Sequence, residues 1–274
     1  MNHSCVHLLR VGLVGLSTIF LVDMGASGQE TERFNLVIEQ IEQDAPAIVG
    51  EHWQFIDMEH GPYLLGRLEE RLAGLKQQAT TRLPITPFVR LPMEGDETAR
   101  YAVKQVLDLG VFGVIFPRVE TKAQAERAVS AMRYPPQRGE TAPTPVGLRG
   151  WGPGRAARLW NLPVAEYVQR ADLWPLDPAG ELLAVIMIES AEGVANVEEI
   201  ASVAGVGALF IGPVDLAMSL GVGPPGSTLA PETETAIQTV LRACKNSGVV
   251  CGMADSNTRS QQRIAEGFRL LLPF

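Results

Sequence analysis

The feature that most constrains the fold is a regular alternation of short apolar segments with segments whose apolar residues recur at helical spacing. Buried strands separated by helices imply parallel βαβ units, and a chain of this length favours a (β/α)8 TIM barrel over a doubly wound sheet. Because no glycine-rich phosphate motif opens any of the helices, nothing supports a nucleotide-binding reading. The predicted strands are 53–57, 86–92, 112–119, 182–189, 208–216, 249–254 and 268–273, with 46–50 as a short eighth candidate. The predicted helices are 31–45, with Thr31 as its candidate cap, 63–79, 95–110, 121–134, 192–203, 231–247 and 257–266.

The N-terminus has the layout of a secretory signal peptide. A short segment containing Arg10 precedes the apolar run 11–22, and small residues stand at the positions before a cut ahead of Gln29. The apolar run is too short to span a bilayer comfortably, so the mature chain is expected to lack a stable membrane span. This predicts a signal peptide over 1–28 and a periplasmic or secreted protein. The alternative is that 11–22 forms a barrel strand, in which case the protein is cytoplasmic.

Residues 29–274 are predicted to form a single barrel domain, interrupted by a Gly/Pro-rich insertion at about 135–180. The formal net charge of −8 argues against nucleic acid or an anionic membrane as partner. A small acidic substrate would therefore need a local positive charge, either an arginine or a metal ion. The three cysteines have no zinc-site spacing and allow no disulfide framework.

Polar residues gather at the predicted C-terminal strand ends, where barrel enzymes carry their catalytic groups. Taken alone, each has an ordinary explanation, such as a helix cap or a structural ion pair. Taken together they are harder to dismiss, because charged groups within apolar runs are costly unless they are paired or bound to metal. These residues are Asp57, Glu59, His60, Arg90, Glu189 and Asp215.

Two carboxylates on neighbouring strands, Glu189 and Asp215, leave coordination positions for water and substrate, as a Mg²⁺-type ion requires. A 2-oxo acid can chelate such an ion, which polarises the keto group while Arg90 stabilises the developing enolate. His60 would move the proton. The predicted mature chain has only one other histidine, His52, so a histidine-rich zinc site is excluded. No lysine stands at an obvious strand end, which disfavours a Schiff-base aldolase.

The segments FIDMEHGP, FVRLP, KQVLDLGVFGVIFPRVET and VIMIESAEGVANVEEIASVAGVGALFIGPVDLAMSLG together resemble the HpcH/HpaI aldolase family. The resemblance implies a barrel of the phosphoenolpyruvate/pyruvate-domain type. It also implies a class II aldolase that cleaves 4-hydroxy-2-oxo acids to pyruvate and an aldehyde, with Mg²⁺ or Mn²⁺ as cofactor and Co²⁺ as a further option, and a homo-oligomer. By matching position it implies that Glu189 and Asp215 bind the metal and that Arg90 contacts the substrate and the enolate. It implies that His60 is the acid/base, oriented by Asp108, and that Asp57 belongs to the same cluster. The substrate carboxylate would be bound by the backbone of Gly212, Pro213 and Val214.

The chain also departs from this family. Met187 stands where many members have a glutamine that helps to hold pyruvate, and about 20 residues of the first βα unit are missing before FIDMEHGP. The chain ends at Phe274, directly after the last predicted strand, where members carry a further helix. Either the segment at 11–22 replaces the first strand, or the barrel is open, or an assembly covers the gap. Two alternatives therefore stand beside the aldolase: a citrate-lyase-like carbon–carbon lyase acting on another 2-oxo acid or an acyl-CoA, and a degenerate barrel without catalysis.

Overall fold

Eight parallel strands form one sheet that curls into a nearly closed barrel, as predicted. The computed structural model describes residues 1, 32–92, 100–139, 141, 143–224 and 228–274. The strands run in the order β1-β8-β7-β6-β5-β4-β3-β2. Their bounds are β1 Ala47–Ile48, β2 Trp53–Asp57, β3 Thr86–Arg90, β4 Gly113–Phe116, β5 Leu183–Ile188, β6 Val206–Ile211, β7 Val250–Asp255 and β8 Leu270–Pro273.

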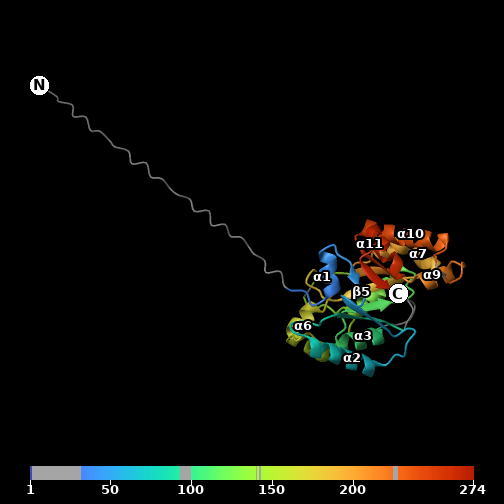
Figure 1. Ribbon diagram of the computed structural model, residues 1–274. Coiled ribbons are helices and arrows are strands. Elements are labelled where there is room, and N and C mark those ends of the chain that lie inside the picture. The colour runs from blue at the N-terminus through green and yellow to red at the C-terminus, as the bar shows by residue number, and fades with distance from the viewer. Residues whose placement is uncertain (2–31, 93–99, 140, 142, 225–227) are drawn as a thin grey trace. The chain divides into compact units, whose positions relative to one another are not determined.

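The helices cover the outside of this sheet. Figure 1 shows α10 and α11 on one side of the barrel and α2 and α3 on the other, with β5 between them. The predicted helix over 192–203 is in fact two short helices, and that over 257–266 begins with a 3₁₀ turn, η1 Asn257–Arg259. The α-helices are α1 Leu36–Glu42, α2 Leu65–Gln78, α3 Arg100–Leu109, α4 Lys122–Met132, α5 Gly154–Trp160, α6 Val164–Arg170, α7 Ala191–Ala195, α8 Val197–Ala201, α9 Pro213–Ser219, α10 Pro231–Ser247 and α11 Ser260–Glu266.

The short candidate strand over 46–50 is real, and it accounts for the shortened first unit. β1 pairs with β8, and β2 follows it after only a turn, with no helix between them. A single bridge, Val49 to Trp53, joins the two edges, and the Trp53 indole N–H donates to the Ala47 carbonyl at 3.3 Å. The barrel therefore closes weakly at this one seam. The residue that caps α1 is Asn35, whose side chain accepts from the N–H of Val37 at 3.0 Å; Thr31 lies outside the described residues.

Large aromatic side chains fill the barrel between the strands. The ring centroid of Trp53 lies 5.5 Å from that of Phe88 and 6.3 Å from that of Phe210, and all three side chains are fully buried. Gly113 on β4 makes room for them, because a Cβ there would lie 2.5 Å from the Phe88 ring. Such layers of packed side chains fill the barrel interior beneath a site at its mouth.

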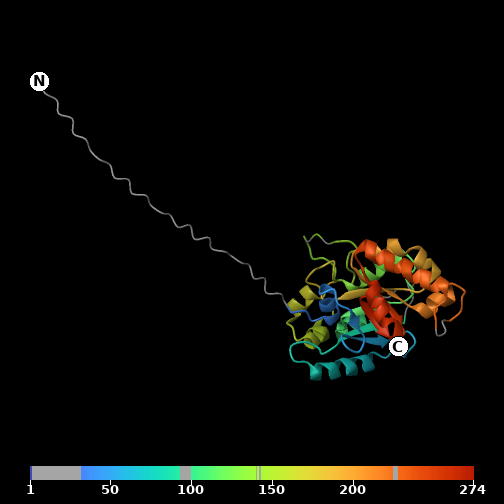
Figure 2. The ribbon, with the colours of Figure 1, turned by 45° about the horizontal axis from the view of Figure 1, so that its top comes forward.

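The described residues of the insertion over 135–180 pack against the rest of the domain. Trp160 of α5 stacks on Phe112 with ring centroids 4.1 Å apart, and its indole N–H donates to the Gly110 carbonyl at 2.9 Å. Arg133 forms a paired hydrogen bond with Asp172 at 2.7 and 2.9 Å. These contacts fix the insertion against the outer face of α3 and the start of β4. Figure 2, turned from the first view, shows α2 lying along the outside of the same part of the barrel.

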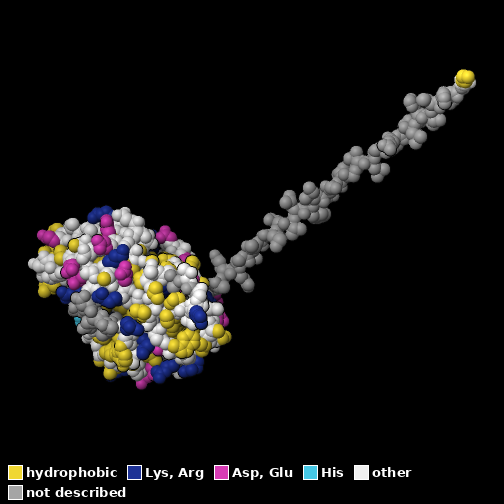
Figure 3. All heavy atoms as spheres, turned by 180° about the vertical axis from the view of Figure 1, so that it is seen from behind, with side chains coloured by type: hydrophobic (Ala, Val, Ile, Leu, Met, Phe, Trp, Pro, Cys, Tyr) yellow, Lys and Arg dark blue, Asp and Glu magenta, His cyan; other side chains and the backbone are white. Residues whose placement is uncertain are grey.

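Arg33–Phe274 form one compact unit, and the chain before Arg33 is grouped apart from it. The predicted signal peptide and the candidate strand at 11–22 fall almost wholly outside the described residues, so both stay predictions. Every described helix falls short of the length and apolar character needed to cross a membrane. Figure 3 shows acidic, basic and hydrophobic side chains interspersed over the face seen from behind.

Candidate functional site

The polar strand ends named from the sequence converge on two adjoining cavities at the mouth of the barrel. The inner cavity, of about 310 Å³, is lined by Arg90, by the backbone turn after β6 and by apolar side chains. The outer cavity, of about 340 Å³, has a more polar lining. His60, Glu189 and Asp215 line both, so these three residues stand where the cavities meet.

Arg90 ends β3 and is held in place by Asp57, which ends the neighbouring strand β2. The guanidinium donates from Nε and Nη2 to the two oxygens of Asp57 at 2.9 and 2.7 Å, and such paired geometry fixes its plane. Burial alone would raise the pKa of Asp57, but the hydrogen bonds from Arg90 and from the backbone N–H of Glu59 outweigh it and hold the pKa below its ordinary value. Asp57 therefore stays ionised and positions Arg90.

Glu59 and His60 follow β2 and lie on the rim of the same site. Arg90 Nη1 comes within 2.9 Å of Glu59 Oε2, an ionic contact without hydrogen-bond alignment, so this buried oxygen accepts no hydrogen bond. Burial raises the pKa of Glu59, opposed by the charges of Arg90 and His60. The His60 side chain is 65% exposed, with Nε2 3.6 Å from Glu59 Oε2. It can thus exchange protons with solvent and still reach both cavities.

Glu189 directly follows β5 and is the most deeply buried carboxylate of the site. Its residue is 5% exposed; Oε1 accepts the backbone N–H of Arg118 at 2.7 Å, whereas Oε2 is buried without any donor. Burial is the main cause that raises the pKa of Glu189 to about 7, and the negative charges of Glu59 and Asp215 add to it. A buried carboxylate with an unpaired oxygen and two acidic neighbours is a costly arrangement unless a cation joins it.

Asp215 does not end a strand, contrary to the predicted strand 208–216. β6 stops at Ile211, and α9 starts at Pro213, because proline suits the first position of a helix and cannot extend a central strand. Asp215 therefore lies in the first turn of α9, exposed at the cavity mouth. Gly212 allows the Glu189 carboxylate to lie close to the turn before α9, because a Cβ at position 212 would lie 2.4 Å from Glu189 Oε2.

These carboxylates suit a hard divalent cation. No group of three or more His, Cys, Asp or Glu residues among those described has a ready-made metal geometry. Yet Glu189 Oε2 and Glu59 Oε2 are both buried without hydrogen-bond donors, and Asp215 repels both carboxylates electrostatically. Mg²⁺ and Mn²⁺ prefer oxygen ligands, and Mg²⁺ usually binds one or two carboxylates and keeps water or substrate in the remaining positions. The donor set fits such an ion.

The remaining predicted binding residues line the inner cavity. Gly212, Pro213 and Val214 form one wall, and Met187 lies opposite Gly212, with its Cε 3.1 Å from where a Cβ on that glycine would be. Phe55, Phe210, Ala254 and Leu272 complete an apolar lining. Where a glutamine would offer hydrogen bonds, Met187 presents a buried thioether to the inner cavity.

Asp108, predicted to orient His60, lines neither site cavity, so the single chain does not bring the two residues together there. It is near the end of α3, where Arg149 Nη2 donates to its Oδ1 at 3.1 Å, and it lines a separate cavity of about 320 Å³. Burial raises its pKa against the charge of Arg149. The insertion also lies away from the site: its described residues line neither site cavity, while Gly152 and Arg155 line the cavity of Asp108.

Sequence reasoning missed Arg118, which lines the outer cavity. It follows β4 as Glu189 follows β5, so the same rule of polar groups at strand ends would have found it. Arg118 was counted within the predicted strand over 112–119. In the structure β4 ends at Phe116, and Arg118 lies beyond it with a left-handed φ of 48°.

Comparison with known proteins finds relatives over most of the chain. A chain named hydroxypyruvate/pyruvate aldolase from Pseudomonas aeruginosa is 35% identical over 222 residues, covering 80% of this chain and 72% of its own. A 5-keto-4-deoxy-D-glucarate aldolase from Citrobacter koseri is 30% identical and covers 78% of this chain and 72% of its own. A crystal structure of an HpcH/HpaI aldolase/citrate lyase family protein from Burkholderia cenocepacia has a TM-score of 0.66 at 33% identity, covering 82% of this chain and 79% of its own.

These names support a carbon–carbon lyase of the aldolase type. The sequence model of the family matches residues 40–270, which include every strand of the barrel except the last residues of β8. The chain therefore belongs to the HpcH/HpaI aldolase/citrate lyase family.

Proposed function

We propose that this protein is a class II aldolase that cleaves 4-hydroxy-2-oxo acids to pyruvate and an aldehyde, or condenses them. The observation that carries the proposal is the unpartnered Oε2 of buried Glu189, which shares a cavity with Arg90 and His60. Cleavage of a 4-hydroxy-2-oxo acid needs a stabiliser for negative charge at the 2-oxo group and a carrier for the 4-hydroxyl proton. The site offers a group suited to each.

Arg90 is the stabiliser. As the C3–C4 bond breaks, its electron pair moves toward C3 and the 2-oxo oxygen, which gains negative charge. A guanidinium already fixed by Asp57 needs no reorganisation to meet that charge, and preorganised donors of this kind contribute the largest single share of many enzymatic accelerations. The backbone from Gly212 to Val214, on the wall of the same cavity, would receive the substrate carboxylate.

His60 is the proton carrier. It takes the proton of the 4-hydroxyl as the aldehyde carbonyl forms, directly or through a water molecule, and the enolate carbon is then protonated to give pyruvate. Glu59 Oε2 lies 3.6 Å from His60 Nε2. In the condensing direction the same groups act in reverse order.

A divalent ion, Mg²⁺ or Mn²⁺, would be held by Glu189 and Asp215, with water and substrate completing its coordination. When bound it would act as a Lewis acid on the 2-oxo group. This role explains why the chain keeps an acidic cluster whose members repel one another.

The test uses the purified mature protein with Mg²⁺ or Mn²⁺ and, in parallel, with EDTA. Pyruvate in D₂O should exchange its methyl protons, followed by ¹H NMR, and 4-hydroxy-2-oxo acids should release pyruvate in a lactate-dehydrogenase-coupled assay; hydroxypyruvate is tested as a second donor. Glu189→Gln and Asp215→Asn should abolish both signals, while Glu70→Gln, at an exposed carboxylate on α2, should leave them intact. Neither exchange nor pyruvate release from wild-type protein with metal would refute the proposal.

A further inference from the structure

Arg118 lines the outer cavity, whereas the inner cavity already has a cationic side chain in Arg90. We propose that Arg118 determines acceptor specificity: its guanidinium binds an anionic group, a carboxylate or a phosphate, on the aldehyde partner. This inference rests on the proposed aldolase function and names the class of aldehyde that the site selects.

The two cavities divide the substrate between them. The inner cavity holds Arg90 and the turn proposed to receive the pyruvyl carboxylate, and the outer one continues past His60, Glu189 and Asp215 to Arg118. The bond that breaks must lie near the residues common to both cavities, because the proton carrier is among them. The aldehyde part therefore extends into the outer cavity, and any group it carries beyond the carbonyl lies on the side of Arg118.

Arg118 is built into the site through its backbone as well as its side chain. It stands between the strands that carry Arg90 and Glu189, and its N–H donates to Glu189 Oε1 at 2.7 Å. Its φ of 48° is uncommon for a residue other than glycine, asparagine or aspartate. A strained residue at a strand end of an active site points to a functional demand on that position.

The charges of the outer cavity explain why an arginine would be needed there. Glu59, Glu189 and Asp215 line the cavity, and the whole chain carries a formal net charge of −8, so an anionic aldehyde meets repulsion. Arg90 cannot offset this on its own, since its guanidinium already faces Asp57 and Glu59.

Among the described lining residues of the two cavities, Arg118 is the other guanidinium, and its side chain is 53% exposed. Its ionic contact with Glu120 is long, at 3.6 Å. At this exposure the side chain is accessible to a substrate anion in the outer cavity. A planar guanidinium matches the two oxygens of a carboxylate or phosphate.

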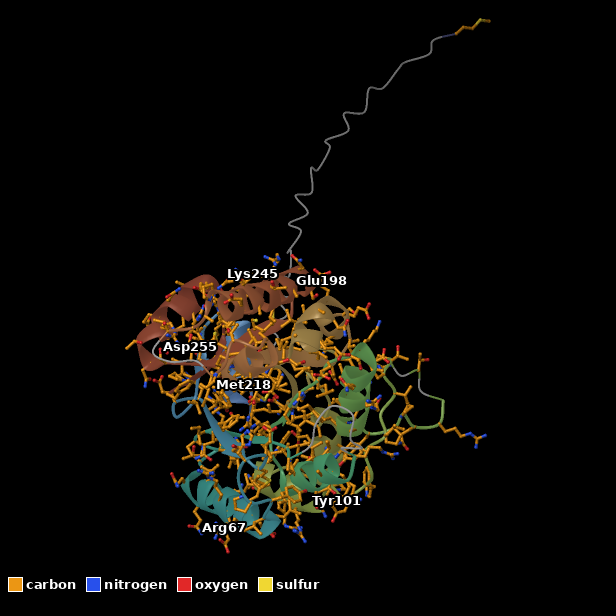
Figure 4. The ribbon with its side chains drawn as sticks, turned by 90° about the vertical axis from the view of Figure 1, so that its right-hand side faces the viewer. Arg67, Tyr101, Glu198, Met218, Lys245 and Asp255 are labelled. Atoms are coloured by element: carbon orange, nitrogen blue, oxygen red, sulfur yellow. The ribbon has the colours of Figure 1, made fainter. Side chains whose placement is uncertain are left out.

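The experiment compares acceptors in the condensing direction with pyruvate as donor. Glyoxylate represents a carboxylate acceptor, glyceraldehyde 3-phosphate a phosphate acceptor, and glyceraldehyde a neutral one. Arg118→Asn removes the charge with a residue that tolerates the left-handed backbone. Arg118→Lys keeps the charge but lacks the planar guanidinium that can bond two oxygens at once. The matched control is Arg67→Gln on α2, which removes an exposed arginine distant from the outer-cavity residue Met218, as Figure 4 shows.

In wild-type protein, kcat/KM should favour one charged acceptor over glyceraldehyde. Arg118→Asn should lower that ratio at least tenfold, chiefly through KM; Arg118→Lys should restore part of it, and Arg67→Gln should stay within twofold of wild type. The acceptor whose ratio falls most identifies carboxylate or phosphate. An equal loss with charged and neutral acceptors, or a wild-type preference for glyceraldehyde, overturns the inference alone. Absence of pyruvate methyl exchange in wild type overturns the proposed function, and this inference with it.

Discussion

Replacing Glu189 with glutamine should stabilise the metal-free protein at alkaline pH. The pKa of Glu189 rises from an ordinary 4.5 to about 7, because the carboxylate is buried and faces two other acidic groups. In the folded state it therefore holds its proton more tightly than in the unfolded state, and its ionisation opposes folding. The stability of wild-type protein should fall as pH rises from about 4.5 to 7, and the full cost should persist above that range.

The size of the effect follows from the pKa. At about 1.4 kcal/mol for each pKa unit, the rise of about 2.5 corresponds to about 3 kcal/mol once Glu189 is ionised in both states. About 2 kcal/mol of this develops between pH 5.5 and 8.5. Glutamine has nearly the same shape, still accepts the Arg118 N–H through Oε1, and carries no charge.

The assay is thermal unfolding in EDTA, for wild type and Glu189→Gln, at pH 5.5 and 8.5. For a domain of this size, 2 kcal/mol corresponds to roughly 4–8 °C in Tm. The Tm advantage of the variant should grow by that amount between the two pH values. Saturating Mg²⁺ should then raise the Tm of wild type and not that of the variant, because only wild type offers the charged ligand. A difference in Tm that stays constant across pH, or shrinks, would show that Glu189 carries no such cost.

Three further outcomes follow from other parts of the structure. Gly212→Ala should lower aldol cleavage more than tenfold and remove stabilisation by Mg²⁺ in thermal unfolding, because the new Cβ would lie 2.4 Å from the buried Glu189 Oε2. Arg263→Met should cost about 1.5–3 kcal/mol in urea unfolding, because buried Asp255 loses one of its two arginine partners and keeps Arg259. Despite burial, hydrogen bonds from arginine hold the pKa of Asp255 low, so wild type should lose this stability as pH falls below about 4, while the variant should show less of that slope. N-terminal sequencing of mature protein from the periplasm or medium should begin at Gln29; an intact Met1 would contradict the signal-peptide prediction.

The sequence predicted the barrel well because strands buried on both faces read as continuous apolar runs. β2 was predicted to the residue over 53–57, and α10 over 231–247. The errors lie at strand ends. The runs over 112–119 and 208–216 were read as strands throughout, although a proline lies inside each, at Pro117 and Pro213. Apolar periodicity does not distinguish the last residues of a buried strand from the first turn of a buried helix. Only the prolines indicated where these two strands end.

The site residues could be predicted from the sequence where charged side chains stand at the C-terminal ends of the strands. Asp57 and Arg90 end the adjacent strands β2 and β3, and Glu189 follows β5, two strands farther along the sheet, so topology brings all three to one end of the barrel. Asp108 was placed by resemblance rather than by topology. It lies toward the end of α3, a helix that runs from the C-terminal end of β3 back toward the start of β4, so a position late in that helix is carried away from the mouth of the barrel.

The shortened first unit weakens the barrel at a place that the site does not depend on. The seam between β1 and β2 rests on one bridge and on Trp53, at the beginning of β2. The residues that carry the proposed chemistry stand at the other end of that strand and farther round the sheet. There Asp57 and Arg90 pair in register, and their hydrogen bonds attach the end of β2 to β3 rather than to β1. Loss of a helix between β1 and β2 can therefore loosen the seam while leaving His60 aligned with Arg90 and Glu189, which argues for a working enzyme rather than a degenerate barrel.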